Sequence, residues 1–116
     1  MRVVPVQLAE GRPVPSRVRL ESSVERAVCA HATARQITFL KLNVRYRRGW
    51  PDVMFLFDNA VVVFVEFKRP GEKQRKLQVY ISGVLMRLGF PVYVVDDVGA
   101  GIRLLERYRA DQEIAE

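Results

Sequence analysis

The stretch GWPDVMFLFDNAVVVFVEFK, residues 49–68, is the part of the sequence that best indicates the fold. Two strand-like runs, 52–57 and 61–67, flank the turn residues 58–60, Asp-Asn-Ala, and this arrangement predicts an antiparallel hairpin. The second run is almost continuously apolar, which is typical of a central strand buried on both faces. Pro51 suits the entrance of the first strand, because a missing amide donor costs least there.

The register of this hairpin brings acidic residues together. If Asn59 is the centre of the turn, the numbers of opposed residues sum to 118, so Asp52 lies opposite Glu66. The β-carbons of opposed residues lie about 4.5–5.5 Å apart, so the two carboxylates can share one cation. Lys68 lies two residues beyond Glu66 and points to the same face. Two carboxylates can hold a hard divalent cation, and a nearby lysine can steer or activate a water.

A helix and a strand are expected before the hairpin. The helix runs from about residue 23 to 35, and Ser22 and Glu25 have the spacing of a capping box at its start. Residues 37–44 combine β-branched and aromatic side chains in partial alternation, which indicates a strand. The buried stripe of the helix recurs at helical spacing and consists of Val24, Ala27, Val28 and His31.

A helix, a strand and a further helix are expected after the hairpin. Arg69-Pro70-Gly71 interrupts the chain before a helix from about 73 to 88, and Gly89 is suited to end it. A strand over 91–95 and a helix over 98–109 follow. The predicted core stripe of the helix from 73 to 88 is Leu77, Ile81, Val84, Leu85 and Leu88.

The order helix, three strands, helix, strand, helix predicts an α/β fold. Its centre is a mixed four-stranded sheet with helices on its faces, and the fourth strand returns beside the third. The length of 116 residues points to one domain. We divide the chain into a proline-rich extended arm (1–20), the folded domain (21–109) and an acidic tail (110–116).

Composition indicates the kind of partner. The chain carries a formal net charge of +6, with a pI of about 10.0, so nucleic acid is the obvious anionic substrate. Cys29 is the one cysteine, so no internal disulfide is possible. There is no secretory signal and no apolar run of membrane-spanning length, so we expect an intracellular protein without a membrane partner.

Basic residues flank the candidate site on both sides in the sequence. They either contact the phosphate backbone or form a solvated face, and their position favours phosphate contact. Tyr46 and Trp50 either stack on bases or pack locally. The candidate DNA-binding residues are Lys41, Arg45, Arg47, Arg48, Trp50, Arg69 and Lys73.

The segments Gly49-Trp50-Pro51-Asp52 and Glu66-Phe67-Lys68, with Gln78 downstream, resemble the VRR-NUC domain of the PD-(D/E)XK nuclease superfamily. The resemblance extends over about residues 21–95, and the short chain resembles the stand-alone phage and bacterial type. It implies a restriction-endonuclease-like core and a metal-dependent, structure-selective endonuclease that cuts branched DNA, such as Holliday junctions, in DNA repair. It also implies a homodimer in the cytoplasm of a bacterial or phage-infected cell.

The resemblance also implies a role for each site residue. Asp52, Glu66, the backbone carbonyl of Phe67 and Glu25 hold Mg²⁺ or Mn²⁺. Lys68 positions or deprotonates the attacking water, or stabilises charge in the transition state. Gln78 orients water, phosphate or Lys68.

Each candidate also has a structural alternative. Asp52 can cap the strand entrance, Glu25 can serve the capping box, and Gln78 can be an ordinary polar helix residue. Glu66 and Lys68 can form a surface ion pair, but such a pair contributes only about 0–1 kcal/mol, which would not explain breaking an apolar strand there. Two further residues are expected to be structural only, namely His31 and Cys29.

Two other functions remain open for the whole chain. One is a non-catalytic DNA-binding module, which would have no need to hold two repelling acids together. The other is a sequence-specific restriction-type nuclease, for which the chain has little room to build a base-reading element.

Overall fold

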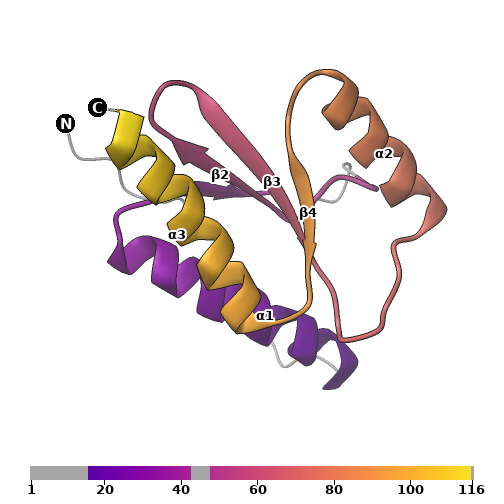
Figure 1. Cartoon of the computed structure of the whole chain (residues 1–116). Helices are drawn as coiled ribbons and strands as arrows, with labels where there is room; N and C mark the ends of the chain where they lie inside the picture. Colours follow the sequence, from indigo (N-terminus) through magenta and orange to yellow (C-terminus); the bar gives the residue numbers. More distant parts are fainter. Residues whose placement is uncertain (1–15, 43–47, 116) are drawn as a thin grey trace.

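The computed structural model describes the backbone of residues 16–42 and 48–115, and the side chains of residues 23–42 and 48–110. The order of the elements is the predicted one, with three helices and four strands (Figure 1). The elements are α1 (Ser16–Ala34), β1 (Thr38–Lys41), β2 (Val53–Phe57), β3 (Val61–Phe67), α2 (Lys76–Arg87), β4 (Val92–Val95) and α3 (Val98–Ala115).

The four strands form one mixed sheet in the order β1-β2-β3-β4. The pairings of β1 with β2 and of β2 with β3 are antiparallel. β4 lies parallel to β3, because α2 carries the chain back towards the end of the sheet where β3 begins. In the hairpin Val53 opposes Val65 and Phe57 opposes Val61, so the predicted register is confirmed. Asn59 and Ala60 have positive φ angles of 63° and 62°, which make the tight turn at its tip.

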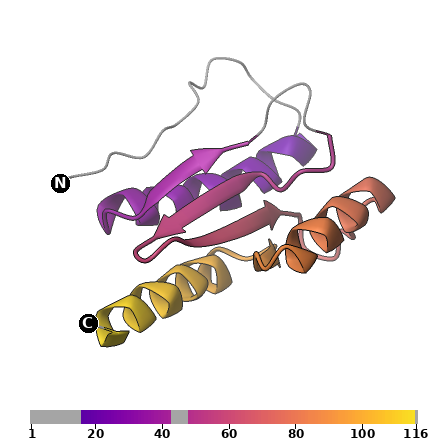
Figure 2. The same cartoon turned by 90° about the horizontal axis from the view of Figure 1, so that it is seen from above.

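One face of the sheet carries the hydrophobic core. Figures 1 and 2 show α1 and α3 side by side against the sheet, with α2 apart from them beside β4. Alternate residues of β2 and β3 point into the core, so Phe64 and Glu66 point to the other face, on the side of α2. The fully buried core side chains include Val28, Ala32, Phe39, Phe55, Val63, Val65 and Leu105.

Both terminal helices are longer than predicted. α1 begins at Ser16, so Ser22 and Glu25 lie inside the helix and the capping-box prediction is wrong. No proline or glycine occurs from residue 16 to 48, so nothing in the sequence delays the helix to residue 23. α3 continues past Arg109 to Ala115 for the same reason. The shorter strand β1 ends at Lys41, and residues 43–44 of its predicted range lie outside the described residues.

The predicted core stripe of α2 is confirmed for Leu85, is partly buried at Ile81 and Val84, and is wrong for Leu77 and Leu88. The buried residues of this helix are Gln78, Ser82 and Leu85, whereas Leu77 and Leu88 are 47% and 68% exposed. Both buried polar side chains have hydrogen-bond partners: Gln78 accepts from Nζ of Lys68 at 3.0 Å, and Oγ of Ser82 accepts from Nε2 of Gln74 at 3.2 Å. These contacts set the rotation of α2 about its axis, and most of its apolar side chains therefore face away from the core.

Glycine at position 101 lets α3 approach α1 and β4 closely. A Cβ atom there would lie 2.6 Å from Cγ2 of Val28 and 3.2 Å from Cγ1 of Val95. We expect Gly101→Ala to lower the free energy of unfolding in urea by about 1–3 kcal/mol through overpacking. Gly83→Ala in α2 is the matched control: its Cβ meets nothing within 4 Å, so helix propensity alone acts and stability should rise by about 1 kcal/mol. Equal effects of the two substitutions would contradict the close packing at residue 101.

Candidate active site

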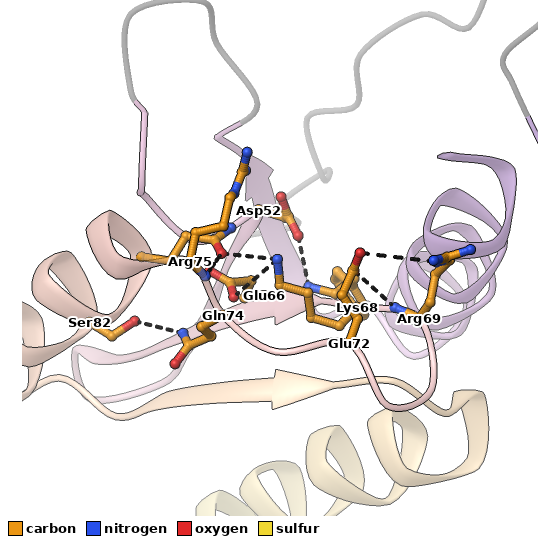
Figure 3. Close-up of polar contacts among 10 residues, drawn as sticks. Asp52, Glu66, Lys68, Arg69, Glu72, Gln74, Arg75 and Ser82 are labelled. Atoms are coloured by element: carbon orange, nitrogen blue, oxygen red, sulfur yellow. Dashed lines mark hydrogen bonds and ion pairs between the residues drawn. The ribbon is translucent and has the colours of Figure 1, made fainter. Parts of the chain in front are cut away.

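Asp52 is fixed across the hairpin, beside the end of β3. Its backbone N–H donates to the carbonyl of Val65 at 3.0 Å, and its Oδ2 accepts a hydrogen bond from the backbone N–H of Phe67 at 2.7 Å. The confirmed register therefore brings this carboxylate to the same end of the sheet as Glu66. Figure 3 shows both acids gathered there with Lys68 and Arg75.

Glu66 is a buried carboxylate without a hydrogen-bond donor. The residue is 1% exposed, and neither side-chain oxygen has a hydrogen-bond partner among the described residues. The nearest cation is the ammonium of Lys68, whose Nζ lies 3.8 Å from Oε2. A buried charge is costly unless it is paired and hydrogen-bonded. A further positive group beside Glu66 would therefore stabilise its ionised carboxylate.

The surroundings of the two acids hinder their ionisation. Burial raises the pKa of Asp52 to about 7; the hydrogen bond from Phe67 opposes this rise, and the negative charges of Glu25 and Glu66 add to it. Burial likewise raises the pKa of Glu66, and the charge of Lys68 and the nearby amide of Gln74 oppose this rise, although Gln74 does not meet the geometry of a hydrogen bond to either oxygen. Shifts of this kind are typical of functional sites.

Lys68 and Gln78 are in direct contact, as the sequence suggested for their side chains. The buried Lys68 donates from Nζ to Oε1 of Gln78 at 3.0 Å. The same oxygen accepts the backbone N–H of Arg75 at 2.7 Å, just before α2 begins. Gln78 in turn is 7% exposed. The start of α2 therefore holds the lysine in place above the sheet.

Glu25 reaches the site from α1, on the other side of the sheet. Its Oε2 lies 3.3 Å from Nζ of Lys41, and both side chains are nearly buried. Within the described part of the chain, no three histidine, cysteine or acidic side chains converge to hold a metal ion. The structure therefore brings together Asp52 and Glu66, and places Glu25 near Asp52 but in an ion pair with Lys41.

The remaining candidate DNA-binding residues differ in their exposure and in their contacts. Arg48 and Lys73 are exposed, and Arg69 approaches Glu72, with 4.0 Å between Nε and Oε2. The ring of Trp50 packs edge-on against Phe64, with centroids 6.3 Å apart. Three candidates of the loop before Arg48 lie outside the described residues, namely Arg45, Tyr46 and Arg47.

His31 and Cys29 have structural surroundings. Nε2 of His31 lies 2.8 Å from Oε1 of Glu106 on α3, so the pair joins the two helices. Cys29 is 3% exposed, and burial raises the pKa of its thiol to about 12. The reactive thiolate is therefore scarce at neutral pH.

The structure adds Arg75, which is not among the DNA-binding residues expected from the sequence. A pocket of about 500 Å³ lies beside the acidic pair and is lined by Arg48, Gly49, Arg75, Leu77 and Gln78. The charge of Arg75 also acts on Glu66, whose pKa it lowers. Its position three residues before Gln78, at the start of a helix, was the signal available in the sequence.

The acidic pair fits a hard divalent cation. Such ions prefer oxygen ligands, and Mg²⁺ is commonly held by one or two carboxylates together with water. Glu66 offers two buried oxygens without donors, and Asp52 lies beside it with one oxygen engaged by Phe67. A divalent cation would supply the positive charge that both carboxylates lack.

Comparisons with known proteins agree with this picture. No family model matches the chain. Over 50 residues it is 42% identical to "Putative nuclease p44" of Acyrthosiphon pisum secondary endosymbiont phage 1, a match that covers 43% of this chain and about half (54%) of that protein. A solved structure described as a VRR_NUC domain superposes with a TM-score of 0.67 at 26% identity, covering 77% of this chain and 97% of the other. None of the described helices is long and apolar enough to cross a membrane.

The raised pKa of Asp52 predicts how stability depends on pH. An acid whose pKa is raised on folding binds more protons in the folded state, so the free energy of unfolding falls as pH rises from 3.8 to about 7. Asp52→Asn removes this loss and keeps an oxygen for Phe67. In urea without divalent ions, we expect it to be more stable than wild type by about 1–4 kcal/mol above pH 7, and about equal below pH 4.

Asp58→Asn is the matched control, since it removes an exposed carboxylate from the turn of the same hairpin. It should show no comparable gain. A gain for Asp52→Asn that is independent of pH would contradict the assignment to ionisation.

Proposed function

We propose that this chain, which carries a VRR-NUC domain, is a metal-dependent endonuclease that hydrolyses phosphodiester bonds in branched DNA. The observation that carries the proposal is the buried carboxylate of Glu66, without a hydrogen-bond donor among the described residues, beside Asp52 and Lys68. A module that only binds DNA gains nothing from holding two repelling acids together. The likeness to a VRR_NUC domain and to a phage protein named as a nuclease supports the same chemistry.

Asp52, Glu66 and the backbone carbonyl of Phe67 would hold Mg²⁺ or Mn²⁺, with Glu25 acting through water. Bound there, the ion would polarise the scissile phosphate and lower the pKa of a water. Lys68 carries its positive charge between Glu66 and Gln78, where it can orient the attacking water or stabilise charge on the phosphate. Gln78 fixes the position of that ammonium.

The basic residues around the site support DNA as the substrate. The net charge of +6 favours a polyanion, and Arg48 and Lys73 expose their charges on the two sides of the acidic pair in the sequence. Contacts of this kind are made to phosphates, so they hold the backbone without reading sequence. We place the activity in the cytoplasm of a bacterial or phage-infected cell, in keeping with the phage relative.

We further propose that the active form is a homodimer, because cutting both strands of a junction symmetrically requires two equivalent sites. The rotation of α2 supports this state, since it leaves several large apolar side chains exposed. They include Val79 (55% exposed), Tyr80 (63%) and Met86 (54%). Large apolar side chains gathered on one element commonly mark a protein interface.

Cleavage of a labelled four-way junction tests the activity. With Mn²⁺ or Mg²⁺ we expect the wild-type protein to cut the junction in preference to linear duplex and flap controls. Glu66→Gln and Lys68→Met should each lower kcat by about 10²–10⁴-fold, since each removes a group that acts on the reacting atoms. Asp58→Asn, in the exposed turn, should retain full activity.

Thermal unfolding of the same proteins completes this test. Mn²⁺ should raise the melting temperature of the wild-type protein but not that of Glu66→Gln. A wild-type protein that is stabilised by Mn²⁺ and binds the junction, yet cuts no DNA, would contradict the enzymatic proposal. Cutting that depends on sequence and not on branching would point to a restriction-type nuclease.

The dimer has its own test in the α2 surface. We expect Tyr80→Glu to shift the chain from dimer to monomer in light scattering coupled to gel filtration, because a charge at a buried apolar interface is costly. Arg87→Gln, at the end of the same helix, should remain dimeric. A wild-type chain that is monomeric at tens of micromolar would exclude this form of the proposal.

A further inference from the structure

We propose that the pocket lined by Arg48, Gly49, Arg75, Leu77 and Gln78 binds one nucleotide of the cut strand, next to the scissile phosphate. We call it the flanking-nucleotide pocket. The inference deepens the proposed function and rests on it for the position of the scissile phosphate, but binding in the pocket is independent of cleavage. Three features of the pocket support this role: its positive charge, the amide of Gln78 and its size.

The flanking-nucleotide pocket is positively charged. Arg48 and Arg75 line it from two segments of the chain. The positive charge of Arg75 also lowers the pKa of Glu66, but no ion pair within 4.0 Å is shown for either arginine among the described side chains. A guanidinium group presents several donors in one plane, which suits phosphate oxygens. The two arginines therefore provide a site for a phosphate group.

Gln78 supplies a third donor from inside the pocket. Its Oε1 accepts hydrogen bonds from Lys68 and from the backbone of Arg75, which fixes the orientation of the amide. Its Nε2 is then the remaining donor of this amide, and it does not belong to the buried side-chain atoms that lack a partner within the described residues. The residue is 93% buried, and α2 begins here with the free N–H groups of its first turn, which favour an anion.

The volume of the flanking-nucleotide pocket exceeds the needs of a phosphate alone. Its 500 Å³ lie within the range of about 300–1,000 Å³ that is usual for small-molecule and cofactor sites. Leu77 is half-exposed and offers an apolar wall to a sugar or base. Gly49 allows the chain to pass against this wall, because a Cβ atom there would lie 2.6 Å from Cγ of Leu77. A whole nucleotide, with its phosphate at the arginines, fits these surroundings.

Gln78 links the flanking-nucleotide pocket to the reacting groups. Gln78 lines the pocket and also holds Lys68 through its Oε1, so a bound nucleotide would lie close to the lysine. Gln78 is thus a positioning residue, which would contact the bound nucleotide and hold Lys68. A nucleotide enters such a pocket most easily where it is already unstacked, as in single-stranded or branched DNA. The pocket therefore gives a physical reason for preferring an unpaired nucleotide beside the cut.

Binding is tested without catalysis, by following backbone amide signals in NMR titrations free of divalent ions. Thymidine 5′-monophosphate should shift the signals of Gly49, Leu77 and Gln78, inorganic phosphate should bind more weakly, and thymidine should leave them unchanged. Arg75→Gln and Arg48→Gln should each weaken nucleotide binding at least about tenfold, in line with the loss of a charge-assisted hydrogen bond. Arg87→Gln, at the far end of α2, should bind like the wild type.

Several results would overturn the inference. Signals that shift elsewhere in the chain, or an Arg75→Gln variant that is folded and binds like the wild type, would exclude the pocket. Inorganic phosphate that binds as tightly as the nucleotide would exclude a role for the nucleoside. An adventitious ion only, with shifts that vanish at moderate salt for every ligand alike, would also exclude it.

Cleavage kinetics separate this inference from the proposed function. Arg75→Gln should raise KM for a junction with an unpaired nucleotide beside the cut by about tenfold, and should change KM for fully paired duplex much less. A wild-type chain that binds the nucleotide but cuts no DNA would support the pocket and contradict the nuclease proposal. An Arg75→Gln variant that cuts DNA normally with an unchanged KM would support the nuclease proposal and contradict the pocket.

Discussion

The hydrogen bond from the backbone N–H of Phe67 to Oδ2 of Asp52 is the interaction on which the site depends. It joins the residue before β2 to the last residue of β3, and so fixes the register at the open end of the hairpin. Because side chains alternate along a strand, a slip of one residue would send Glu66 into the hydrophobic core. The apolar residues on the core face therefore determine where the acids lie, and the site follows from the packing.

This arrangement has a cost in stability. Two carboxylates lie together in a buried setting, the pKa of each is raised, and Glu66 lacks a hydrogen bond within the described residues. Lys68 offsets part of the charge, but its ammonium is shared with Gln78 and lies 3.8 Å from Glu66. Folded proteins keep such local strain mainly where function needs it. A divalent cation between the acids would relieve the repulsion and supply the chemistry together.

The sequence carried most of the fold because its strongest signals were local. The turn at Asn59 and the alternation on either side of it were enough to predict the register of β2 against β3, and the apolar run of β3 correctly marked a central strand. The helix limits were less well determined, because Ser22 and Glu25 matched a capping pattern by chance inside a longer helix. An uninterrupted run of helix-forming residues outweighed that pattern.

Features that depend on tertiary contacts could not be predicted from the sequence. Apolar spacing predicted that Leu77 faces the core, but the hydrogen bonds of Gln78 and Ser82 rotate α2 and leave Leu77 half-exposed. The ion pair between Glu25 and Lys41 joins α1 to β1, so no local pattern could reveal it. Arg75 entered the site only because the start of α2 folds back over the end of β3.

The most direct test of the cation site is a crystal structure of the chain grown with Mn²⁺, with anomalous diffraction data. We expect an anomalous peak within ligand distance of both Asp52 and Glu66, about 2.0–2.3 Å from their carboxylate oxygens, and none in crystals of Glu66→Gln. A protein that shows Mn²⁺-dependent cleavage but carries its anomalous peak away from these two acids would contradict the account.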